Sequence, residues 1–197
     1  MKIVEYRGIE GLVYAPITED TTENFTTGEV KELAGTSELT RTTESSSEVH
    51  YYDNMPAITI ESTGSDEVTC TVSAIPLDIL ADITGQVYDE TTDTFIEGAR
   101  ENKYFALGYK TKKTDGTEVY VWRLKGTFSI PESTHATEDD GTDANGQELT
   151  YTGISTTHKF TKTNKGAKAI NVLADGKANV TDFFKTVQTP DTITAKA

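Results

Sequence analysis

Apolar and polar residues alternate most clearly in two stretches near the middle of the chain. In the first, every second residue is apolar and the residues between are threonine or serine; the apolar positions are Val68, Cys70, Val72 and Ala74. The second, residues 103–130, alternates on both sides of a Thr114-Asp115-Gly116 turn; its apolar positions are Phe105, Leu107 and Tyr109, then Tyr120, Trp122 and Leu124. A period of two predicts strands with one buried face, and the glycine turn predicts that the second stretch is a hairpin.

Two shorter apolar stretches also predict strands. Residues 11–17 form an apolar run that we expect to end at Pro16, and residues 149–160 form a second extended segment. Residues 39–52 are extended but strongly polar, so we expect a strand on an exposed or pore-lining sheet, with a plain Ser/Thr loop as the alternative.

Helical spacing occurs twice. After Pro76, apolar residues recur at Leu77, Leu80 and Ala81, and Gly85 is a suitable end, so we expect a short helix that covers one side of the sheet. Near the C-terminus, Asn179 can cap a helix over residues 179–188 that ends before Pro190. Its apolar stripe consists of Val180, Phe183, Phe184 and Val187. We expect the stripe to dock either on the body of the same subunit or in a groove of another copy.

Two long polar segments lie between these elements. Residues 18–36 and residues 131–148 look too long and too polar to be connectors within a core. The second is acidic, with no lysine or arginine from residue 132 to 148, and its acids include Glu138, Asp139, Asp140 and Asp143. We expect at least one of the two segments to reach a neighbouring subunit, because an ordered loop without a core of its own needs a partner. The alternative is a solvated loop.

Length and composition agree with one mainly β domain over residues 1–197. The chain is rich in threonine, which is β-branched and suits a pleated, half-wet surface. We expect a β-sandwich or barrel with one flanking α-helix, the short C-terminal helix and long polar loops. Residues 165–197 are a candidate C-terminal extension.

Charge and chemistry point away from several classes of function. The net charge of −14 opposes binding to nucleic acid, and Cys70, the only cysteine, cannot form an internal disulfide. No signal peptide, membrane anchor, nucleophile elbow or phosphate loop is recognisable. The three histidines, His50, His135 and His158, lack metal-ligand spacing, and the acidic loop lacks both end ligands of an EF-hand. We therefore expect no enzyme activity, no cofactor and no metal, with a loose surface cation site in the acidic loop as the minor alternative.

Five stretches, in order along nearly the whole chain, carry a family resemblance. They are YRGIEGLVYA (6–15), TESSSEVHYYDN (43–54), KYFALGY (103–109), WRLKGTF (122–128) and HATEDDGTD (135–143). Together they resemble the major tail proteins of siphophages, bacteriophages with long, flexible, non-contractile tails, of Gram-positive hosts. The part beyond residue 165 resembles them least.

The resemblance implies a structural virion protein. Such proteins are made in the cytoplasm of the host bacterium and form hexameric rings that stack into a tail tube. Their partners are other copies of themselves, the tape-measure protein, and the tail terminator and distal tail proteins. DNA passes through the lumen during ejection without specific binding, and the family has no catalytic residues.

The polar strand and the central hairpin supply residues for such a lumen. We expect residues 39–52 and 103–130 to contribute to the inner sheet of a tube, where joining of strand edges between subunits would order polar strands. Glu44 and Glu48 are the acids expected nearest the channel, partly offset by Arg41. An Ig-like or lectin-like binding or decoration module is the alternative, and it predicts a monomer with an exposed aromatic ligand patch.

Overall fold

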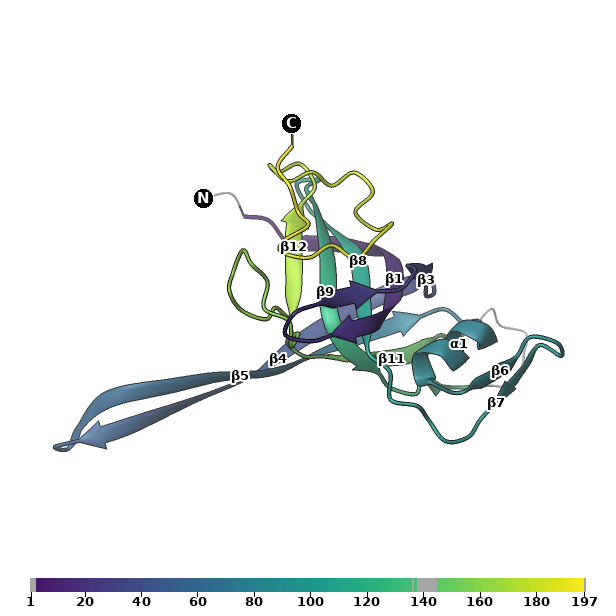
Figure 1. Cartoon of the computed structure of the whole chain (residues 1–197), viewed down its shortest axis with the longest axis horizontal. Helices are drawn as coiled ribbons and strands as arrows, with labels where there is room; N and C mark the ends of the chain where they lie inside the picture. The colour runs from purple at the N-terminus through teal and green to yellow at the C-terminus, as the bar shows by residue number, and fades with distance from the viewer. Residues whose placement is uncertain (1–2, 136, 138–144, 197) are drawn as a thin grey trace.

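Antiparallel strands predominate in the part of the chain that the structure describes, together with one short helix (Figure 1). The computed structural model describes residues 3–135, 137 and 145–196. The strands are β1 (Tyr6–Asp20), β2 (Phe25–Thr27), β3 (Lys31–Glu32), β4 (Thr36–Tyr52), β5 (Met55–Val72), β6 (Val87–Asp89), β7 (Thr94–Ile96), β8 (Phe105–Lys113), β9 (Glu118–Phe128), β10 (Glu132–Ser133), β11 (Gln147–Gly153) and β12 (Ala169–Leu173). The helix is α1 (Leu77–Thr84). The expected mainly β fold with one flanking helix is confirmed.

A single sheet runs through the molecule in the order β2-β1-β8-β9-β11-β5-β4. Strand β9 lies at its centre: β8 pairs with one edge, while β12 and then β11 pair along the other. β3 pairs with β1 and β10 with β11, whereas β6 and β7 form a separate small hairpin. The predicted central hairpin is therefore confirmed as β8 and β9.

Both faces of the central hairpin are buried, which explains why its residues are apolar on both sides. The inner face contributes to a core closed by α1; its buried members are Leu12, Tyr14, Leu33, Val68, Cys70, Val72, Ile75, Ile83, Phe105, Leu107, Tyr109, Val119, Val121, Phe128, Leu149 and Tyr151. The outer face packs against the C-terminal segment; its buried members are Ala15, Ala106, Trp122, Leu124, Phe160, Val172, Phe183 and Val187. This close packing leaves no room for a side chain at Gly108, because a Cβ there would lie 2.9 Å from the Trp122 ring.

The helix over residues 77–84 is confirmed, and it ends where expected. Gly85 takes a left-handed backbone conformation with φ of 66°, and an added Cβ would collide with the Glu101 carbonyl. The helix buries Ala81 and Ile83, while Leu77 is exposed. It is joined to the sheet by the Tyr14 hydroxyl, which donates to Asp82 Oδ2 at 2.9 Å.

Strand β1 continues beyond Pro16, so the expected end at that residue is wrong. Pro16 has no N–H to donate, but its carbonyl accepts a hydrogen bond from Gly28 N at 2.8 Å, and the strand continues to Asp20. A hairpin with β2 follows, and Leu33 is buried with its N–H bonded to the Leu12 carbonyl. Residues 18–36 are therefore integral to the subunit's own fold, contrary to the expectation of a loop.

The predicted helix over residues 179–188 is wrong, because the backbone there is not helical. Residues 181–185 form turns with hydrogen bonds of Phe183 N to the Val180 carbonyl and Lys185 N to the Asp182 carbonyl, and Asp182 has a φ of 59° that no α-helix accepts. Burial of the stripe was predicted correctly, since Phe183 and Val187 are almost fully buried. The Trp122 indole donates to the Phe183 carbonyl at 3.0 Å, so the stripe docks on the same subunit's sheet.

Strand β11 ends at Gly153, earlier than the expected residue 160, and the following segment bends away to let β12 pair with β9. The polar strand expected over residues 39–52 is confirmed as part of β4, and the loop alternative for it is wrong.

Candidate functional site

A long arm projects from the body of the molecule (Figure 1). It consists of the outer halves of β4 and β5, from Glu44 and Ser65 to the tip, and their ladder runs without a break from Ser45–Thr63 to His50–Ile58. Asp53 and Asn54 form its two-residue turn with φ values of 50° and 64°, as a tight hairpin turn requires. Figure 1 shows no other element beside the outer half of the arm.

Apolar side chains gather in the outer half of this arm. They are exposed by 42% to 66%: Val49, Tyr51, Tyr52, Met55, Ile58 and Ile60. Single exposed apolar residues are ordinary on soluble proteins, but a group on one projecting hairpin marks a contact surface. A two-stranded hairpin alone in water is also marginally stable, so a partner along its length would order it.

The two faces of the arm differ. Residues paired directly across an antiparallel ladder share a face. One face carries the pairs Ile58–His50 and Ile60–Glu48. The opposite face carries the pairs Thr59–Val49 and Glu61–Ser47. The face with Ile58 and Ile60 is therefore the more apolar. Each face carries one carboxylate, Glu48 on the first and Glu61 on the second.

The arm carries acids and no permanent cation. Its ionisable residues are Glu44, Glu48, Asp53 and Glu61, together with His50, and no lysine or arginine occurs between residues 42 and 99. His50 Nε2 lies 3.9 Å from Glu48 Oε1. Whatever packs along the arm therefore meets a surface of negative charge.

A β-bulge marks the base of the arm. The ladder pairs Thr43 with Asp66 and then Ser45 with Thr63, so Gly64 and Ser65 together face only Glu44. The Glu44 carboxylate accepts a hydrogen bond from the Ser65 hydroxyl at 3.0 Å. A Cβ on Gly64 would lie 2.9 Å from the Glu44 Cβ, so the close approach of the two strands at this bulge requires glycine.

A buried carboxylate anchors the bulge to the body. Asp66 is 4% exposed and pairs with the equally buried Arg123 of β9. Lys168 Nζ lies 3.6 Å from Asp66 Oδ1 and also donates to the Gly64 carbonyl. Arg123 NH2 lies 3.4 Å from the Tyr109 hydroxyl. The direction in which the arm leaves the body is thus tied to three elements, β5, β9 and the segment before β12.

The structure separates the residues that the sequence suggested for a channel. Glu44 holds the bulge, Glu48 lies farther out on the arm, and Arg41 lies on the body side of the bulge with its guanidinium bonded to Thr43 Oγ1 at 2.9 Å. All three are exposed, and their position at a lumen stays a prediction. Glu138, Asp139, Asp140 and Asp143 lie outside the described residues.

Sequence reasoning missed most of the arm's second strand. Alternation was recognised only from Val68 onward, where β5 enters the core. The available signal was the Asp53-Asn54 pair, since these residue types tolerate the left-handed conformation of a hairpin turn.

Two other kinds of site are absent from the described residues. No group of three or more His, Cys, Asp or Glu side chains there could hold a metal ion. No helix among them is both long and apolar enough to cross a membrane.

No protein-family model matches the chain, and no curated protein matches its sequence.

Proposed function

We propose that this chain is the subunit of a self-assembling tube, the tail tube of a long-tailed bacteriophage. Rings of six copies stack around a tape-measure protein, are closed by terminator and distal tail proteins, and later conduct DNA into the host. The subunit would be made in the bacterial cytoplasm and end in the virion. The carrying observation is the arm, a hairpin that projects from the body with exposed apolar side chains.

The edges of the sheet support the same proposal. Among the described residues, strand β4 pairs only with β5, so the other edge of β4 has no strand hydrogen-bonded to it. Free edges add strands from other chains, and closed assemblies remove them. The five stretches that resemble siphophage tail proteins include the arm from Thr43 to Asn54.

The acidity of the arm suits a conduit. Acids on a wall repel phosphates over roughly a Debye length, about 8 Å at physiological salt. Arms that contribute Glu44 and Glu48 to the lumen would let DNA slide without adhering. A binding or decoration module, the alternative, gives no reason for a bare projecting hairpin.

The arm can be removed without touching either core. We would replace residues 46–62 by Asn-Gly, which joins Ser45 to Thr63, a pair already opposed in the ladder. Purified wild-type protein should form tubes by negative-stain electron microscopy, and the armless variant should stay a folded monomer with a similar melting temperature. The matched control, Thr59→Ala with Glu61→Gln, alters the more polar face and should keep its tubes.

Two results would contradict the proposal. One is a wild-type chain that stays monomeric at high concentration and moderate salt, which would favour the binding-module alternative. The other is normal tubes from the armless variant, which would show that the arm is not needed for assembly and would remove the observation that carries the proposal.

A further inference from the structure

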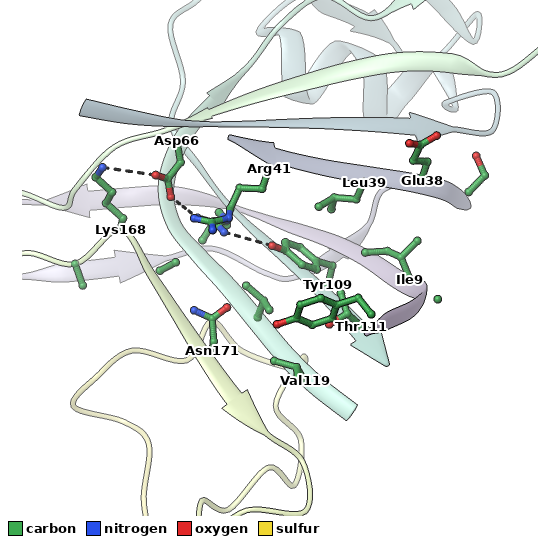
Figure 2. Close-up of a pocket in the computed structure, with 17 residues that line it drawn as sticks. Ile9, Glu38, Leu39, Arg41, Asp66, Tyr109, Thr111, Val119, Lys168 and Asn171 are labelled. Atoms are coloured by element: carbon green, nitrogen blue, oxygen red, sulfur yellow. Dashed lines mark hydrogen bonds and ion pairs between the residues drawn. The ribbon is translucent and has the colours of Figure 1, made fainter. Parts of the chain in front are cut away.

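A pocket of about 870 Å³ opens beside the base of the arm, and residues of β1 and β4 are part of its lining. Figure 2 shows Lys168, Asp66 and Arg41 at one end, and Ile9, Thr111 and Val119 toward the other. Leu39 and Tyr109 lie between the two ends (Figure 2). The cations therefore gather at one end of the pocket, and the apolar side chains of Ile9 and Val119 lie toward the other, where Glu38 is also labelled.

Positive charge exceeds negative charge along the pocket as a whole. The cations that line the pocket are Arg41, Arg123 and Lys168, and the acids are Asp66 and the exposed Glu38. This excess occurs in a chain whose net charge is −14. Asp66 must serve both Arg123 and Lys168, so one carboxylate faces two cations where the site is most buried. Buried charges are normally paired, and a second anion would complete the pairing.

One donor in this cluster is unsatisfied. Arg123 is 3% exposed, and its Nε is buried without a hydrogen-bond partner among the described residues. The other two guanidinium nitrogens face Asp66 and the Tyr109 hydroxyl. A buried donor without a partner is costly, so Asp66 and Tyr109 do not fully satisfy the Arg123 guanidinium.

We propose that this pocket binds a carboxylate carried on an apolar stem. The carboxylate oxygens would lie between Lys168 and Arg41, beside the Arg123 guanidinium, and the stem would lie along Leu39, Tyr109 and Val119. Such a group is either a free carboxylic acid or a glutamate side chain of a second copy of this chain. Only the second source rests on the proposed tube.

Hexanoate is a suitable probe, with hexanol as its neutral match. The subunit is kept dilute, and light scattering shows that it remains monomeric. Hexanoate should raise the melting temperature in a saturable manner and shift the NMR signal of the Arg123 Nε–H, while hexanol at equal concentration should do neither. Equal effects of the two probes, or an Nε–H signal that does not move, would overturn the proposal.

Arg41 permits a test that leaves the buried pair intact, since its side chain is exposed. Arg41→Gln should weaken hexanoate binding by about threefold to tenfold through loss of one charged contact. Arg7→Gln is the matched control, because Arg7 lies in β1 between two lining residues and does not line the pocket itself. Equal affinity in both variants would show that the polar end does not bind the carboxylate.

Assembly separates the two sources. If hexanoate slows wild-type tube growth in proportion to pocket occupancy, the natural ligand is a carboxylate of a second copy. If it binds without effect on tubes, the natural ligand is a free carboxylic acid. A chain that forms no tubes would refute the proposed function, while the binding result for the monomer would stand.

Discussion

At the scale of single residues, buried carboxylates join parts of the chain that are distant in sequence. Asp20, at the end of β1, accepts from Lys125 Nζ at 2.5 Å and from the backbone N–H of Thr157 and His158 at 2.8 and 2.9 Å. Burial alone would raise the pKa of Asp20, but these donors outweigh it and hold the pKa below its ordinary value. The folded state therefore prefers the ionised form.

Asp20→Asn tests this contact. At pH 7 we expect the free energy of unfolding to fall by about 1.5–3 kcal/mol, the usual range for hydrogen bonds to a charged group. Because the folded pKa is lowered, the contribution is complete above the unfolded-state pKa of about 3.9 and is lost as the pH falls through the folded value. Urea unfolding of both proteins should therefore give a difference that shrinks below about pH 4.

The control for this measurement is Asp175→Asn, which removes a charge from an exposed position. It should change stability little at either pH. An Asp20→Asn difference that is the same at pH 7 and pH 3 would contradict the assignment.

Such contacts could not be read from the sequence. Asp20 is separated by 105 residues from Lys125 and by 138 from His158. Asp66, Arg123 and Lys168 are likewise far apart, and each is an ordinary charged residue in its own neighbourhood. The pairing of β11 with β5 and β9, and of β12 with β9, brings them together, so the sequence alone could not predict the charged end of the pocket.

At the scale of elements, local patterns predicted what local forces determine. The β8–β9 hairpin and α1 were recognised because alternation, a glycine turn and a capping glycine act within a few residues. The outer half of β5 was missed because it buries no side chain, and without a buried face the sequence has no reason to alternate. In the C-terminal segment, helical spacing predicted the buried residues correctly. The backbone is not helical, because Asp182 takes a left-handed conformation and the Phe183 carbonyl accepts from the Trp122 indole.

The docking of that segment gives an element-scale prediction. Phe183 is buried against Tyr120, with ring centroids 5.5 Å apart, and Phe184 contacts Tyr120 and Trp122. The double change Phe183→Ala and Phe184→Ala should lower the free energy of unfolding of the isolated subunit by at least about 3 kcal/mol, because it leaves a cavity over the sheet. Thermal unfolding of the monomer measures this directly.

Thr181→Ala, at an exposed position of the same segment, is the control and should melt like the wild type. If the double variant melts normally and only its assembly fails, the segment serves a neighbouring copy instead of its own subunit.

At the scale of the whole molecule, association must overcome like charge. Each subunit carries a net charge of −14, and the projecting arm is acidic. Salt shortens the range of this repulsion from about 30 Å at 0.01 M to about 8 Å at 0.15 M. The apolar contacts of the arm are weakened far less by salt, so ionic strength should favour assembly.

We therefore expect the critical concentration for tube formation, measured by sedimentation, to fall as salt rises over this range. Glu48→Gln with Glu61→Gln removes two charges from the arm and should make assembly less dependent on salt. Tubes that dissolve as salt rises would show instead that ion pairs between subunits dominate the interface.

The distribution of cations also decides which proteases can cut the arm. Trypsin cleaves after lysine or arginine, and none occurs between residues 42 and 99, so the arm offers it no peptide bond. Chymotrypsin cleaves after large apolar residues, and Tyr51 and Tyr52 stand exposed beside the turn. Resistance to trypsin therefore gives no information about the arm. Chymotrypsin should cut the tip of an arm that is exposed to solvent and should not cut one that another molecule covers.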